Sequence, residues 1–245
     1  MIETPAALKT VPMVFKRHEQ KYVMDQDTYQ RLLVALENEI TIDQFGRQTI
    51  SSLYYDTDSY MFARRQLDDS KYREKLRLRA YGSDVTADQT AFIELKKKVL
   101  GITYKRRIAV PYHEAKAYLA GEGGLTVSAD MNKREIDFFV QDHSLTRNTA
   151  VIYERSAYAT ETGLRLTFDE NIRWRTEDTD LLTGTTGTPL LAPGMVVMEI
   201  KIPQTLPFAW SHLFAGLKIY PQPFSKYGLI YKYGILGGQQ CLSAI

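Results

Sequence analysis

Leu76-Arg77-Leu78-Arg79 is the segment that decides the fold, because it alternates apolar and cationic side chains residue by residue. Successive side chains of a β-strand point to opposite faces of the sheet, so the two leucines share one face and the two arginines share the other. The same period of two recurs in four further segments, namely Glu94-Leu95-Lys96, Lys105-Arg106-Arg107, Leu164 to Asp169 and Glu199-Ile200-Lys201. We therefore predict an antiparallel sheet with one charged face that carries both signs of charge.

The remaining pattern predicts the elements around these segments. Seven strands are expected, at Thr49–Asp56, Lys75–Ala80, Phe92–Val99, Tyr104–Val110, Val151–Tyr158, Leu164–Asp169 and Val196–Ile202. Four helices are expected, one after an N-cap at Asp25, one over Tyr112–Leu119, one that begins at Asn132 with Glu135 in a capping box, and one over Pro207–Gly216. If the charged face points inward, the apolar stripes of these helices cover the outer face. The predicted fold class is α+β, an antiparallel β-barrel of about eight strands that encloses a tunnel and is covered by amphipathic helices.

Composition narrows the class of protein. The 245 residues contain no repeat and no long linker, so residues 1–245 are predicted to form one domain. Lys and Arg number 31 against 29 Asp and Glu, and this near balance argues against a nucleic-acid partner. The single cysteine, Cys241, excludes an intrachain disulfide, and no stretch reaches the ~20 apolar residues of a membrane span. A soluble chain in a reducing compartment is expected.

The charged face carries the chemistry. Arginine binds phosphate oxygens with two parallel hydrogen bonds, and lysine adds a compact charge. Carboxylates on the same face would repel an anion unless a divalent metal lies between them. An ordinary sheet with one solvated face explains any single strand equally well. Taken together, the strands predict a site for a metal and a polyanion.

Eight segments, in this order, resemble a known family: Glu19-Gln20-Lys21-Tyr22, Ser52 to Thr57, Tyr72 to Arg79, Glu94-Leu95-Lys96, Glu154-Arg155, Leu164-Arg165-Leu166, Glu199-Ile200-Lys201 and Phe224-Ser225-Lys226-Tyr227. They are similar to the VTC domain of the triphosphate tunnel metalloenzymes, over nearly the whole chain. The resemblance implies a tunnel that binds triphosphate or polyphosphate together with Mg²⁺ or Mn²⁺.

Site residues follow from the resemblance position by position. The implied phosphate-binding and catalytic residues are Lys21, Arg77, Arg79, Lys96, Arg155, Arg165 and Lys226, with Lys201 and Ser225 as further substrate contacts. The implied metal carboxylate is Glu199, with Glu19 and Glu94 beside it. In the wider superfamily two glutamates often precede the first lysine, as Glu-x-Glu-x-Lys, whereas here Arg17 takes the first position. This departure favours the VTC branch over the hydrolytic branch, and it leaves fewer metal ligands.

The resemblance also implies an activity. Eukaryotic members of the family make polyphosphate from ATP, so a metal-dependent polyphosphate polymerase is the first expectation. A tri- or polyphosphatase or nucleoside triphosphatase that uses the same tunnel is one alternative, and a module that only binds polyphosphate or nucleotide is the other. The chain has no room for the regulatory SPX domain or the membrane-spanning parts of the eukaryotic enzymes. The expected location is the cytoplasm, either free or at the inner face of a membrane through a separate membrane-protein partner.

Overall fold

The computed structural model describes residues 18–68, 71–100, 102–203 and 205–237, and Arg17 and Cys241 lie outside these ranges. One antiparallel sheet runs through the described residues, in the order β1-β9-β7-β6-β2-β3-β4-β5, with the short strand β8 on β7. The strands are β1 (His18–Asp25), β2 (Thr41–Asp56), β3 (Tyr72–Tyr81), β4 (Thr90–Val99), β5 (Ile102–Pro111), β6 (Thr146–Ala159), β7 (Arg165–Arg175), β8 (Thr188–Pro189) and β9 (Met195–Ile202).

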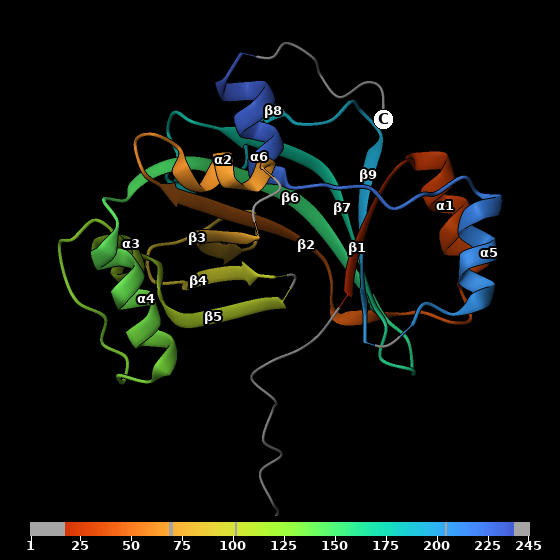
Figure 1. Ribbon diagram of the computed structural model, residues 1–245, viewed down its shortest axis with the longest axis horizontal. Coiled ribbons are helices and arrows are strands. Elements are labelled where there is room, and N and C mark those ends of the chain that lie inside the picture. Colours follow the sequence, from red (N-terminus) through yellow and green to blue (C-terminus); the bar gives the residue numbers. More distant parts are fainter. Residues whose placement is uncertain (1–17, 69–70, 101, 204, 238–245) are drawn as a thin grey trace, which may run out of the picture.

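The sheet curls so that its two edge strands, β1 and β5, come round toward each other (Figure 1). Among the described residues no ladder of backbone hydrogen bonds joins these two edges. A side-chain contact bridges the gap instead, because Nζ of Lys96 on β4 lies 3.0 Å from Oε2 of Glu19 on β1. The predicted antiparallel barrel is therefore confirmed as a fold, and its backbone ladder stays open on one side.

Six α-helices lie in the described part of the chain. They are α1 (Gln26–Ala35), α2 (Met61–Leu67), α3 (Tyr112–Leu119), α4 (Met131–Asp142), α5 (Phe208–Gly216) and α6 (Lys226–Leu229), the last followed by a π-helical turn over Ile230–Ile235. Four of them match the predicted helices. In α1 the cap is Asp25, whose Oδ1 accepts the N–H of Thr28 at 2.7 Å. In α4 the cap is Asp130 rather than the predicted Asn132, since Oδ1 of Asp130 accepts the N–H of Lys133.

Two apolar clusters cover the outer face of the sheet, as the alternation predicted. Helices α1 and α5, side by side at the right of Figure 1, pack on β1, β7 and β9 through residues such as Leu32, Phe168 and Trp210. Helices α3 and α4 pack on β3 to β5, where Leu76 and Leu78 of the deciding segment are fully buried. At roughly 2 kcal/mol for each buried large side chain, these two layers supply most of the hydrophobic stabilisation.

A third apolar cluster lies on the inner face, which the sequence pattern predicted to be polar. Tyr54, Tyr153 and Val197 point inward there and pack against Phe224 and Tyr227 of the C-terminal segment. The rings of Tyr54 and Tyr227 are stacked, with centroids 4.6 Å apart. Helix α6 and the π-helical turn thus fill part of the barrel, and only the rest of the inner face is charged.

Two strands and two α-helices escaped the sequence prediction, and one of them, β8, has only two residues. Strand β1 was missed because its eight residues mix Glu, Gln and Lys with few β-branched side chains. Helices α2 and α6 were missed because they are only seven and four residues long. In the described ranges no helix combines the length and the apolar composition needed to cross a membrane.

Candidate functional site

The charged part of the inner face lines a cavity of about 580 Å³. Ten cationic side chains line it, namely Lys21, Lys75, Arg77, Arg79, Lys96, Lys105, Arg106, Arg155, Lys201 and Lys226, together with three carboxylates, Glu19, Glu94 and Glu199. They come from β1, β3, β4, β5, β6, β9 and α6. The antiparallel registers bring them together, because residues directly opposite each other share a face, as Lys21 and Glu199 do.

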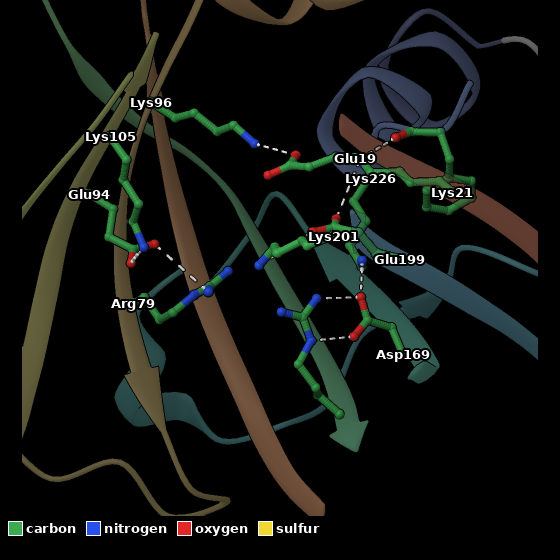
Figure 2. Close-up of polar contacts among 12 residues, drawn as sticks. Glu19, Lys21, Arg79, Glu94, Lys96, Lys105, Asp169, Glu199, Lys201 and Lys226 are labelled. Carbon is green, nitrogen blue, oxygen red and sulfur yellow. Dashed lines mark hydrogen bonds and ion pairs between the residues drawn. The ribbon is translucent and has the colours of Figure 1, made fainter. Parts of the chain in front are cut away.

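Glu94 is the centre of the first ion cluster (Figure 2). Its side chain is 2% exposed, and Arg77 Nη2 and Lys105 Nζ lie 2.7 and 2.6 Å from its oxygens. Arg107 Nε lies 2.9 Å away and Arg79 Nη1 3.8 Å away. Burial alone would raise the pKa of Glu94, but these cations outweigh it and hold the pKa well below its usual range. Glu94 is therefore ionised and holds two of the predicted phosphate-binding arginines in place.

Asp169 is the centre of the second cluster, on the opposite wall (Figure 2). Arg155 binds it with two parallel hydrogen bonds, from Nε to Oδ1 and from Nη2 to Oδ2, the second 2.7 Å long. Lys226 Nζ donates to Oδ2 as well. Burial would raise the pKa of Asp169, but Arg155 and Lys226 outweigh it and keep the pKa below its usual range. The acid is 2% exposed and was not predicted as a site residue.

Glu199 lies between two lysines on β9 and β1. Its oxygens are 3.9 Å from Lys21 Nζ and 3.7 Å from Lys201 Nζ, and its side chain is 19% exposed. Burial would raise the pKa of Glu199, but Lys21, Lys201 and Arg155 lower it to about 2. Lys21 Nζ also donates to the carbonyl oxygen of Phe224 at 2.7 Å. Because both lysines lie more than 3.5 Å from its oxygens, the Glu199 carboxylate is held less tightly than that of Glu94 or Asp169.

A second, smaller cavity of about 490 Å³ adjoins the first. It lies toward α2 and the segment 222–232, and Lys98 and Lys232 add to its basic wall. The two cavities share six lining residues, which are Glu19, Lys21, Lys75, Lys96, Thr103 and Ser225. The Lys96–Glu19 ion pair thus lies at their junction. Ser225 also caps α6, since its Oγ accepts the N–H of Gly228.

All but one of the site residues expected from the sequence line the larger cavity. Arg165 is the exception, because it is exposed and does not line either cavity, although it lies opposite Lys201 in the ladder. Lys75 and Lys105 were missed, as was Asp169 behind the wall. The alternation that selected Arg77 and Arg79 extends to Lys75, so this signal was present in the sequence.

The C-terminal motif is held in the barrel by the buried acid Asp56, the last residue of β2. Asp56 Oδ1 accepts the N–H of Phe62, and Oδ2 accepts the N–H of Ala63, so the acid anchors the start of α2. Oδ2 also accepts the hydroxyl of Tyr227, at 2.8 Å. Tyr227 stacks on Tyr54, whose hydroxyl accepts a hydrogen bond from Arg77. Asp56 thereby links α2 and α6 to Arg77 on β3, by way of Tyr227 and Tyr54.

Comparisons with known proteins agree with this geometry. The family model for the VTC domain matches residues 16–233. A protein from Bacillus halodurans described as a candidate adenylate cyclase is similar in fold, with 15% identity and a TM-score of 0.54 over 91% of this chain and 99% of that one. A candidate adenylyl cyclase from Hippeastrum, described as having a dominant triphosphatase activity, has 15% identity and a TM-score of 0.52 over 89% and 96%. No curated protein matches the chain.

Proposed function

The chain belongs to the VTC domain family, and from this premise we propose that it transfers the γ-phosphoryl group of ATP to the end of an inorganic polyphosphate chain, with the help of a divalent metal. The fold is that of the triphosphate tunnel proteins, which the two solved structures share. The choice of polymerase over other tunnel chemistry is the proposal.

The positive charge of the larger cavity is the main observation that supports this proposal. Ten cations line the cavity with three carboxylates, and two further carboxylates, Asp169 and Glu135, pair with Arg155, Lys226 and Arg106 from behind the lining. An excess of five positive charges therefore remains in a partly enclosed space. Enclosed, uncompensated ions cost several kcal/mol each, so the cavity favours a strongly anionic ligand. A single phosphate group carries only about −1.5 to −2 at pH 7. A ligand with several linked phosphates, such as ATP, triphosphate or polyphosphate, matches the excess best.

The roles follow from position. Arg77, Arg79 and Lys96 would hold the triphosphate of ATP on the β3–β4 wall, while Lys21, Arg155 and Lys226 would hold the acceptor on the opposite wall. A terminal oxygen of the acceptor attacks the γ-phosphorus, the bond to the bridging oxygen breaks, and its electron pair leaves with ADP. Such transfer needs in-line placement and neutralisation of charge more than covalent help. Arg165 has no part in this arrangement.

A divalent metal fits the site only in partnership with phosphate. The described residues contain no group of three or more His, Cys, Asp or Glu side chains placed to hold an ion by themselves. Glu199 faces the cavity and is ionised, and Mg²⁺ commonly binds one or two carboxylates together with substrate phosphates. When bound, the ion would neutralise phosphate charge. Glu19 is the second candidate ligand, whereas Glu94 is already engaged by four cations.

Hydrolysis is the second candidate function. It would use the same cations and metal, with water as the acceptor in place of a phosphate chain. The described triphosphatase activity of the Hippeastrum protein, which shares this fold, favours it. The difference between the two reactions lies in whether the acceptor wall excludes water.

Products distinguish these candidates directly. The purified chain is mixed with ATP and Mn²⁺ or Mg²⁺, and the products are separated by gel electrophoresis and phosphate assay. Long-chain polyphosphate is the expected result, phosphate alone would indicate a hydrolase, and unchanged ATP would indicate a binding module. Glu199→Gln should abolish turnover in the same assay. Glu170→Gln is the matched control, because Glu170 pairs with Arg47 outside the cavity.

A further inference from the structure

Lys75 occupies the wall that the two cavities share. It lies on β3, directly opposite Lys96 in the ladder with β4, and it shares a face with Arg77. Its neighbour Glu74 also lines the smaller cavity, but its carboxylate pairs with Lys97. A ligand that extends from the larger cavity into the smaller one must therefore pass Lys75.

Lys75 differs from the other cations of the larger cavity in having no partner. Nine of the ten donate to, or form an ion pair with, a carboxylate or another acceptor within the described part of the chain. Lys75 makes no such contact there. The charges that act on it most strongly are cationic, namely Lys96, Lys21 and Arg77, and the attraction of Glu199 is weaker than any of these repulsions. A cation in this setting is stabilised only when an anion arrives.

The pKa of Lys75 agrees with this lack of a partner. Burial, followed by Lys96, Lys21 and Arg77, holds the pKa of Lys75 well below its usual value. A phosphate placed beside Lys75 reverses these effects and raises its pKa. Between the lower pKa of the free protein and the higher one of the complex, ligand binding draws a proton from the solvent onto Nζ.

We propose that Lys75 is a phosphate contact at the junction of the two cavities, kept without a partner in the free protein and protonated when a linear tri- or polyphosphate binds across it. This inference rests on the proposed function for the class of ligand. It adds a contact residue that the family resemblance did not supply, and it couples ligand binding to proton uptake. Affinity should accordingly fall as the pH rises.

Calorimetric titration with inorganic tripolyphosphate tests the proposal on the full chain, in two buffers of different ionisation enthalpy at several values between pH 7 and 9. Lys75→Met should weaken binding about 10-fold or more, the scale of a lost charged hydrogen bond. It should also take up fewer protons than the wild type, by up to one per ligand. Lys75→Arg should keep the affinity within about 3-fold but lose the same proton uptake, since arginine stays charged. Lys71→Met, an exposed lysine outside both cavities, should change neither quantity.

The test compares proton uptake between variants rather than its absolute value, because Lys21 and Lys105 also have a lowered pKa and remain in every variant. Wild-type affinity in Lys75→Met would overturn the contact. Wild-type proton uptake in Lys75→Arg would overturn the coupling. Failure of the wild type to bind tripolyphosphate at all would refute the proposed function, which is distinguishable from either outcome.

Discussion

Asp169→Asn is the perturbation that tests the electrostatics of the cavity most directly. The acid is 2% exposed and binds Arg155 and Lys226, whose side chains are 19% and 14% exposed. Removing one partner of such a buried cluster typically costs about 3–5 kcal/mol, because the remaining charges are left uncompensated. For a chain of this size that corresponds to a fall in Tm of roughly 6–20 °C.

Ligand binding should reverse much of this loss. Without Asp169 the two cations are free for phosphate, so tripolyphosphate should bind the variant more tightly than the wild type. A ligand at 100 times its Kd stabilises a protein by about 2.7 kcal/mol. At one fixed ligand concentration, the rise in Tm should therefore be larger for Asp169→Asn than for the wild type.

The assay is thermal unfolding followed by circular dichroism, with and without tripolyphosphate. Asp27→Asn is the control, because Asp27 pairs with Arg31 one turn away on α1 in an exposed setting that is worth less than about 1 kcal/mol. A fall in Tm for Asp169→Asn no larger than for this control would refute the reasoning. So would an equal rise in Tm for both chains when ligand is added.

The pH dependence of stability has a definite sign. The pKa of Asp169 is depressed in the folded chain, so its contribution to stability is present above the ordinary aspartate pKa and is lost as the pH falls through the folded value. Wild-type Tm should therefore fall between about pH 5 and pH 2 by more than that of Asp169→Asn. Equal acid sensitivity of the two chains would contradict the assigned charge state.

Glu199→Gln should abolish metal-dependent turnover while leaving the unfolding temperature within a few degrees of the wild type, and full activity would make the metal assignment wrong. Arg77→Ala should weaken tripolyphosphate binding about 10-fold or more by calorimetry, since a charged hydrogen bond is lost; unchanged affinity would remove Arg77 from the site. Burial is the main cause that lowers the pKa of Lys105 to about 8, so its charge and its contribution to polyanion binding should decline above that pH. Lys105→Arg should abolish that part of the pH dependence of binding. Tyr227→Phe removes the hydroxyl that donates a hydrogen bond to Asp56 but keeps the ring stacked on Tyr54. It should lower the free energy of unfolding by about 1–3 kcal/mol, as measured by urea unfolding. A change below about 0.5 kcal/mol would make that hydrogen bond unimportant.

Local patterns predicted most of the strands and most of the helices because their physical cause is local. Alternation within Leu76 to Arg79 already separates the two faces of β3, and the stripe after Asp25 already specifies α1. Element ends were predicted less accurately, since β2 extends eight residues before the predicted Thr49 through a bulged, partly exposed stretch. The inner apolar cluster was not predicted, because it needs the C-terminal segment to return into the barrel.

Individual site residues were predictable, whereas their partners were not. Arg155 and Lys226 were expected to face phosphate, but their shared partner Asp169 lies 14 and 57 residues away in the sequence. Only the register of β6 on β7 and the position of α6 bring these three groups together. Arg165 illustrates the reverse case, because it follows the alternation of β7 but lies at the strand end, where the cavity does not reach.

The carboxylates that pair with the cations explain how so cationic a cavity can be stable when empty and still bind phosphate. Arg155 uses two of its five N–H groups on Asp169, so three remain for a ligand. Arg77 likewise keeps unused N–H groups beside its contacts with Glu94 and Tyr54. The carboxylates therefore fix the planes of the guanidinium groups before the ligand arrives, and the ordering entropy of these side chains is lost on folding rather than on binding. A cavity with the same excess of charge but no carboxylates would have to order its arginines during binding and would be less stable when empty. The acids thus stabilise the empty cavity and orient its arginines, and they compete with phosphate for only part of the N–H groups.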